Sequence, residues 1–120
     1  MRKKILLAED QNDVRNMMKT LLELDGYQVI EAANGYEAVE RAVDDTPDLI
    51  LMDMAMPVMD GLDSSRTIRQ HESLERVPIV AVTAYGDFYA DRVREAGCTD
   101  LLQKPLDFGR LIPLVEQYIC

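Results

Sequence analysis

The chain has 120 residues, of which 22 are acidic and 13 are Lys or Arg, and its formal net charge at pH 7 is −9. A chain of this length suits one domain with its own core, so we expect a single domain over residues 1–120. Nucleic-acid affinity comes largely from Lys and Arg side chains that neutralise phosphates. The acidic balance therefore argues against direct nucleic-acid binding.

The sequence lacks the features that target a chain to a membrane or an oxidising compartment. The two cysteines, Cys98 and Cys120, are too few for a disulfide framework. The apolar run at residues 5–8 ends at Glu9 and is too short for a signal peptide, and no later run is long enough to span a membrane. We therefore expect a reduced, cytoplasmic protein that has no membrane partner.

The first part of the chain predicts two strand–helix units. Residues 4–8, KILLA, are typical of a parallel strand buried on both faces, whereas residues 28–32, QVIEA, are mixed, as in an edge strand. Gly26 is a stop signal for the helix between them, and Asn34 with Glu37 forms a capping-box pattern at the start of the next helix. The apolar positions with helical spacing are Val14, Met17, Met18, Leu21 and Leu22 in the first helix, and Ala38, Val39, Ala42 and Val43 in the second.

The next two units contain the expected central strands. Residues 49–52, LILM, and residues 79–83, IVAVT, are continuous apolar runs. The helix expected over residues 61–70 has only Leu62 and Ile68 as clear apolar anchors. The helix expected over residues 87–96 is closed by Gly97.

The last unit combines a mixed strand, residues 100–103, with a helix that contains a proline. Pro113 has no N–H to donate, so this helix either kinks at Pro113 or begins near Arg110, where Pro113 falls in the first turn. We favour the later start. The apolar side of the helix comprises Phe108, Leu111, Leu114, Val115 and Tyr118.

The order of these units predicts the fold. Five strand–helix units form a doubly wound α/β domain with a five-stranded parallel sheet, five helices and right-handed crossovers. Sheets of this kind bind ligands outside the carboxyl ends of their strands. The residues that follow the strands are therefore the candidates for a functional site.

Charged and hydroxyl side chains lie at the ends of four predicted strands, and only the second strand offers nothing comparable. Glu9 and Asp10 follow the first strand and Asp53 the third, Thr83 ends the fourth, and Lys104 follows the fifth. Two carboxylates about 4 Å apart repel by roughly 4 kcal/mol at an effective dielectric of about 20, so three together need a proton or a cation. Lys104 is one cation. Mg²⁺ is a natural second, because it accepts carboxylate ligands and keeps sites for water and phosphoryl oxygens.

Each of these residues has a structural explanation when it is taken alone. An Asp at a strand end is commonly a turn former, Thr83 is a β-branched strand residue, and Lys104 is a surface charge. Glu9 and Asp10 can stabilise the start of the following helix. These explanations do not predict that all five gather at one edge, so we interpret the cluster as a phosphoryl-transfer site with a carboxylate nucleophile.

In combination, the motifs LLAED, LILMDMAMPVMDG, VPIVAVTA and LLQKP resemble those of response-regulator receiver domains of the chemotaxis-regulator type. The resemblance covers residues 3–118 and implies a flavodoxin-like three-layer sandwich with strand order 2-1-3-4-5. It implies that the protein is a phospho-acceptor of two-component signalling, which assists its own phosphorylation and dephosphorylation, rather than an enzyme.

The resemblance also implies the role of each clustered residue. Asp53 is the phospho-acceptor, which receives the phosphoryl group from a sensor histidine kinase or a phosphotransfer protein. Thr83 hydrogen-bonds a phosphoryl oxygen, and Lys104 pairs with the phosphoryl group and precedes a cis bond to Pro105. Pro57 and Gly61 shape the loop after the acceptor.

A Mg²⁺ site is part of the same resemblance. Asp10 and Asp53 bind the ion directly, the main-chain carbonyl of Ala55 is the third protein ligand, and Glu9 acts through water. Glu9 departs from the family's usual aspartate and is one methylene longer, which fits contact through water.

Phosphorylation is expected to change the surface of the fourth helix, fifth strand and fifth helix, so that an unidentified downstream protein binds. The domain is expected to be a monomer or a weak dimer formed on phosphorylation. Leu101 stands where many members carry an aromatic switch residue, so the output passes instead through residues 84–87, or through Tyr85 and Phe88. Ala55 cannot orient a hydrolytic water and Tyr85 can shield the site, which predicts a long-lived phosphoryl group.

Two alternatives belong to other functional classes. The first is a docking module with the receiver fold that is never phosphorylated, in which Leu101 reflects constitutive docking. The second is a phosphohydrolase with an aspartate nucleophile. Such enzymes carry an Asp-x-Asp motif after the first strand, whereas here Asp10 is followed by Asn12.

Overall fold

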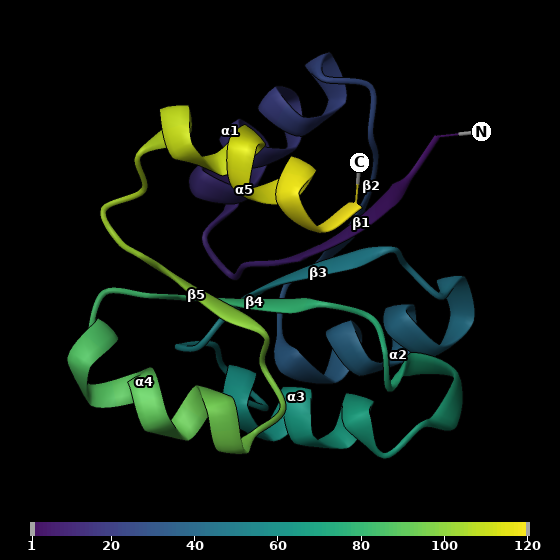
Figure 1. Cartoon of the computed structure of the whole chain (residues 1–120), viewed down its shortest axis with the longest axis vertical. Coiled ribbons are helices and arrows are strands. Elements are labelled where there is room, and N and C mark those ends of the chain that lie inside the picture. The colour runs from purple at the N-terminus through teal and green to yellow at the C-terminus, as the bar shows by residue number, and fades with distance from the viewer. Residues whose placement is uncertain (1, 120) are drawn as a thin grey trace.

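The predicted apolar runs form five parallel strands in the order β2-β1-β3-β4-β5 (Figure 1). The computed structural model describes residues 2–119; Cys98 is a buried free thiol, and Cys120 lies outside the described residues. β1, β3 and β4 are almost entirely buried, whereas β2 and β5 are partly exposed edge strands. The predicted fold class and strand order are confirmed. The strands are β1 (Lys4–Ala8), β2 (Gln28–Ala32), β3 (Leu49–Asp53), β4 (Ile79–Thr83) and β5 (Asp100–Gln103).

Helices cover both faces of the sheet. α1 and α5 pack on one face and α2, α3 and α4 on the other, which makes three layers (Figure 1). None of the helices within residues 2–119 has both the length and the apolar character needed to cross a membrane. The helices are α1 (Asn12–Leu24), α2 (Gly35–Asp45), α3 (Gly61–Arg69), the short 3-10 helix η1 (Glu72–Leu74), α4 (Gly86–Glu95) and α5 (Phe108–Ile119).

Alternate residues of the central strands enter two halves of the core. Leu6 and Ile50 belong to the half that includes side chains of α2, α3 and α4. Leu7 and Leu51 belong to the half that includes side chains of α1 and α5. Each fully buried side chain of this size contributes roughly 2 kcal/mol, so the central strands and the residues at their carboxyl ends are held firmly in place.

Three helices bury different side chains from those that their apolar patterns predict, and in α2 the difference is Val43, which is exposed. In α3, Ser64 is fully buried, and its hydroxyl donates a hydrogen bond to the Gly35 carbonyl at 2.8 Å. The weak pattern of α3 thus reflects close packing of small side chains against α2. In α1, Met18 is buried but Met17 is 53% exposed, so the apolar spacing of α1 predicts more buried side chains than the helix has.

The start of α5 differs from the prediction. α5 begins at Phe108 rather than near Arg110, so Pro113 lies inside the helix and not in its first turn. Pro113 is exposed, whereas the opposite side of the helix is buried. Each buried side chain contributes roughly 2 kcal/mol, and together they outweigh the cost of about 3 kcal/mol for an internal proline. The buried side chains are Leu111, Val115 and Ile119.

Replacement of Pro113 with alanine restores an N–H that can donate to the Gly109 carbonyl one turn earlier. Pro113 is exposed, so the change leaves no cavity, and we expect the free energy of unfolding in urea to rise by about 1 to 3 kcal/mol. Glu116→Ala, at another exposed position of α5, is the control and should change stability by less than about 0.5 kcal/mol. Unchanged stability of Pro113→Ala would contradict a regular helix through this residue.

Candidate functional site

The carboxyl ends of β1 and β3 bring three carboxylates together. The two strands are neighbours in the sheet, so Glu9 and Asp10 emerge beside Asp53. One carboxylate oxygen from each residue lies within 4.8 Å of the other two. Glu9 is 1% exposed and Asp53 3%, whereas Asp10 is open to solvent. Two of the three charges are therefore withdrawn from water.

Lys104 supplies the compensating positive charge. Its Nζ lies 3.2 Å from Oδ2 of Asp53 and 3.3 Å from Oε1 of Glu9. Its main-chain N–H donates to the Thr83 carbonyl at 2.7 Å, and the bond from Lys104 to Pro105 is cis. Burial alone would lower the pKa of Lys104, but the two carboxylates outweigh it and raise the pKa above its usual value. The ammonium group thus stays charged between them.

The buried carboxyl group of Glu9 has a raised affinity for a proton in this arrangement. Burial, and then the adjacent carboxylate of Asp53, raise the pKa of Glu9 to about 7. The main-chain N–H of Gln11, which donates to Oε2 at 3.1 Å, and the charge of Lys104 oppose that rise. Near neutral pH, the carboxyl groups of Glu9 and Asp53 can therefore lie side by side when Glu9 is protonated or when a cation binds beside them.

Asp53 ends β3 in a fixed orientation. Its Oδ1 accepts the N–H of Ala55 at 3.1 Å, while its Oδ2 contacts Lys104. The loop returns to this point at Gly61, whose N–H donates to the Met54 carbonyl at 3.1 Å. A side chain on Gly61 would overlap the main-chain carbonyl of Asp53. The apolar strand therefore ends on a carboxylate that is buried and held on both oxygens.

Thr83 ends β4, the strand between β3 and β5. The residue is buried, and its Oγ1 accepts the main-chain N–H of Tyr85 at 3.0 Å. This contact leaves the hydroxyl proton of Thr83 available to a further acceptor. Tyr85 is the residue before α4, so the contact links the site to the start of that helix.

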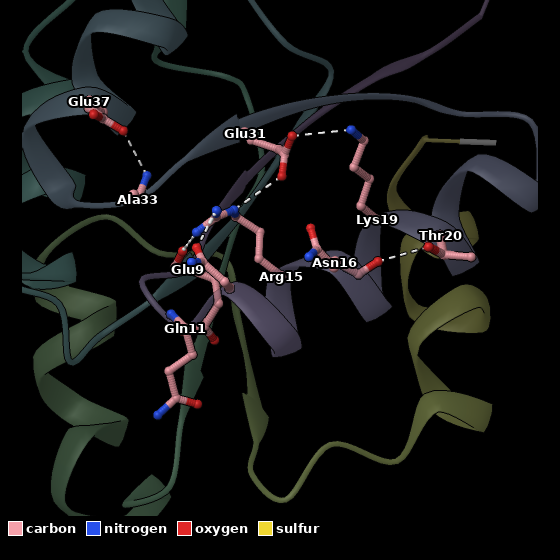
Figure 2. Close-up of polar contacts among 10 residues, drawn as sticks. Glu9, Gln11, Arg15, Asn16, Lys19, Thr20, Glu31, Ala33 and Glu37 are labelled. Carbon is pink, nitrogen blue, oxygen red and sulfur yellow. Dashed lines mark hydrogen bonds and ion pairs between the residues drawn. The ribbon is translucent and has the colours of Figure 1, made fainter.

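The sequence pattern did not indicate that Arg15 and the second strand lie next to the candidate site. Figure 2 shows the Arg15 side chain between the end of β1 and β2, where it bonds the main-chain carbonyl of Glu9 and the carboxylate of Glu31. β2 offers no functional side chain at its carboxyl end, but its residue Glu31 binds the same guanidinium that bonds the Glu9 carbonyl. The available signal was a carboxylate inside a half-buried strand, because such a group needs a partner.

The geometry agrees with a family match over most of the chain. Residues 5–116 match the model of the family described as the response regulator receiver domain. This chain belongs to that family. The predicted resemblance is therefore confirmed, and it places this receiver domain in two-component signalling.

Several known proteins are similar to this receiver domain over nearly its whole length. The polar-differentiation response regulator DivK of Brucella anthropi is 34% identical over 122 residues, which cover 99% of this chain and 98% of that protein. The structure of the chemotaxis response regulator CheY4 of Vibrio cholerae matches with a TM-score of 0.93 at 28% identity, over 99% of this chain and 100% of that one. The receiver domain of the sensor histidine kinase PA1611 from Pseudomonas aeruginosa PAO1 matches with a TM-score of 0.91 at 34% identity, over 98% of each chain.

The acidic cluster of this receiver domain can hold a metal ion. Its three members offer oxygen ligands close enough to share one cation. Carboxylate oxygens at one edge of a rigid sheet suit a hard ion such as Mg²⁺. In the related PA1611 receiver domain, a magnesium ion is coordinated in the active site cleft.

The raised pKa of Glu9 predicts a pH-dependent stability of the metal-free protein. The folded state binds this proton more tightly than the unfolded chain at pH values between 4.5 and about 7. We expect the free energy of unfolding, measured in urea with EDTA, to fall across that range by up to roughly 3 kcal/mol. Glu9→Gln should remove this loss and be the more stable protein above neutral pH.

The control for this measurement is Glu40→Gln, which neutralises an exposed carboxylate in α2. Its pH dependence should follow that of the wild type. If Glu9→Gln and the wild type have the same pH dependence, the electrostatic cost does not lie at Glu9.

Proposed function

We propose that this receiver domain accepts a phosphoryl group on Asp53 from the phosphohistidine of a sensor histidine kinase or phosphotransfer protein, in a Mg²⁺-dependent reaction. The observation that carries the proposal is the state of Asp53, a buried carboxylate held by Ala55 on one oxygen and by Lys104 on the other. The protein acts as the acceptor and assists its own phosphorylation and dephosphorylation.

In this reaction a carboxylate oxygen of Asp53 attacks the phosphorus atom. A new P–O bond forms, the P–N bond to the donor imidazole breaks, and its electron pair stays on the leaving nitrogen. The fixed carboxylate needs little reorganisation before attack, which lowers the barrier. Lys104 remains beside Asp53, where its charge can pair with the transferred group.

The donor set fits Mg²⁺ in the following way. Asp10 and Asp53 would bind the ion directly, the main-chain carbonyl of Ala55 would be the third protein ligand, and Glu9 would act through water. When bound, the ion neutralises charge on the incoming phosphoryl group. The exposed position of Asp10 leaves room for a donor at the mouth of the site.

The transferred group is expected to recruit Thr83. Its hydroxyl accepts from Tyr85 and still has a proton to donate, so it can bond a phosphoryl oxygen. A movement of Thr83 would strain its bond to the Tyr85 N–H, which lies at the start of α4. In this way phosphorylation would change the surface of α4, β5 and α5, to which a downstream protein binds.

Leu101 supports a main-chain route for this change. Its side chain is half-buried against the core and has no aromatic ring that could act as a switch. Tyr85 is 68% exposed and Phe88 is also exposed, so both are accessible to a partner.

The surface beside Lys104 suits a protein donor. A groove of about 340 Å³ runs from Lys104 along the connection between β5 and α5 to α1. Met17 and Phe108 contribute apolar surface to it. A macromolecular donor needs such a surface next to the acceptor, whereas a small phosphodonor does not.

The direct test is incubation with acetyl phosphate and Mg²⁺, followed by intact-mass measurement. We expect the wild type to gain one phosphoryl group, and Asp53→Asn or EDTA to abolish the gain. Asp44→Asn, which changes an exposed carboxylate in α2, is the control and should still be labelled. If the wild type binds Mg²⁺ but gains no phosphoryl group, the unphosphorylated docking module becomes the better explanation.

The lifetime of the phosphoryl group tests the role of Ala55. This exposed residue has no group that can orient a water for hydrolysis, so we expect slow loss of phosphate from the wild type after acetyl phosphate is removed. Ala55→Asn supplies such a group and should shorten the lifetime roughly tenfold. Tyr85 points into solvent in this structure, so the expectation rests on Ala55 rather than on shielding.

Val58→Asn is the matched control for the lifetime, because Val58 lies in the same loop and is 84% exposed. It should lose phosphate at the wild-type rate. Rapid loss from the wild type would show that hydrolysis does not depend on a side chain at position 55.

A further inference from the structure

We propose that Arg15 is a positioning residue for the metal site, which orients the peptide between Glu9 and Asp10. The inference rests on the proposed Mg²⁺-dependent function and names a residue that controls the affinity of the site. Arg15 does not contact the space between the three carboxylates, so it acts through the main chain.

The guanidinium of Arg15 makes three hydrogen bonds to three parts of the structure. Nη1 donates to the main-chain carbonyl of Glu9 at 2.8 Å, Nη2 to Oδ1 of Asn12 at 2.6 Å, and Nε to Oε1 of Glu31 at 3.1 Å. The side chain is 15% exposed. As Figure 2 shows, Arg15 therefore ties the end of β1 to α1 and to β2.

Glu31 holds the guanidinium in place from β2. Its second oxygen, Oε2, accepts from Nζ of Lys19 at 3.2 Å (Figure 2). Burial raises the pKa of Glu31, but hydrogen bonds from Lys19 and Arg15 outweigh this effect and lower the pKa below its usual value. Glu31 is therefore ionised at neutral pH and anchors both cations.

The contact with Glu9 sets the direction of one peptide group. The Glu9 carbonyl and the Asp10 N–H belong to the same planar unit, so a bond to the carbonyl fixes both. The Glu9 N–H is already held by the Ala32 carbonyl at 3.0 Å. Within residues 2–119, Asp10 itself makes no hydrogen bond or ion pair, so the peptide groups on either side hold it. Arg15 bonds the Glu9 carbonyl before it, and the Gln11 N–H after it donates to Oε2 of Glu9 at 3.1 Å.

The loss of Arg15 is expected to have two opposite effects on Mg²⁺ affinity, one from its positive charge and one from its hydrogen bond to Glu9. A guanidinium close to an acidic site repels Mg²⁺, so removal of its charge alone should strengthen metal binding. Loss of the bond to Glu9 should instead weaken metal binding, because the peptide before Asp10 is then held less firmly. Partners that orient metal ligands typically contribute roughly 10- to 100-fold to affinity.

The experiment is calorimetric titration of the whole chain with Mg²⁺, using wild type, Arg15→Ala and Arg15→Lys. We expect both variants to bind Mg²⁺ roughly tenfold more weakly, since lysine keeps the charge but its single nitrogen cannot span the three acceptors that the guanidinium fork reaches. Lys19→Ala removes one positive charge from the same cluster without a contact to Glu9. Its Mg²⁺ affinity should stay within about twofold of the wild type or become tighter.

A second variant covers the case in which changes at Arg15 prevent folding. Glu31→Gln keeps Arg15 but weakens its anchor, and it should bind Mg²⁺ more weakly than Lys19→Ala does. Circular dichroism of each variant confirms that the protein titrated is folded.

The outcomes separate this inference from the proposed function. If wild type binds Mg²⁺ and folded Arg15→Ala binds equally or more tightly, Arg15 does not position the site, and the proposed function is untouched. The same holds if Arg15 variants do not fold and Glu31→Gln binds like the wild type. If the wild type does not bind Mg²⁺, both the proposed function and this inference fail.

Discussion

Repulsion among carboxylates at the edge of an apolar sheet is the constraint on which the site depends. Glu9 and Asp53 are buried side by side, and Lys104 lies between them at 3.3 and 3.2 Å. The metal-free protein thus meets a cost that a pair of apolar side chains would not impose. A bound divalent ion would relieve the same repulsion, because it would place positive charge beside these carboxylates.

The apolar strands make this arrangement possible. β1 and β3 are buried along nearly their whole length and pack against helices on both faces. Strands held so firmly cannot move apart to let the charges separate. The carboxylates must instead find partners where they stand, and these include Lys104 and the main-chain N–H groups of Ala55 and Gln11. The core thus keeps the buried carboxylates close together, where their repulsion favours a nearby positive charge.

Around the site, hydrogen bonds to main-chain groups link the site to neighbouring helices and strands. Thr83 contacts the Tyr85 N–H at the start of α4, and Arg15 contacts the Glu9 carbonyl at the end of β1. Each bond joins a residue of the site to a helix or a neighbouring strand. Leu101 packs against the core and has no aromatic ring.

The sequence by itself determined the strands, their parallel arrangement and the five residues at their carboxyl ends. Continuous apolar runs such as residues 49–52 have few alternatives to a buried strand, and a charged residue directly after each run must lie at the edge of the sheet. These features depend on local pattern and on topology, both of which can be inferred along the chain. The family resemblance followed from the same residues, since they are also its motifs.

The tertiary structure alone decided the features that depend on contacts between distant segments. The prediction that α5 begins near Arg110 was wrong, because burial of Leu111, Val115 and Ile119 outweighs the hydrogen bond lost at Pro113. The exposure of Met17 and the shifted pKa of Glu9 depend on which surfaces other elements cover. The part played by Arg15 needs β2 beside α1, so that Glu31 and the Glu9 carbonyl meet one guanidinium. No pattern along the chain encodes such a meeting, because packing energy and not sequence spacing brings these groups together.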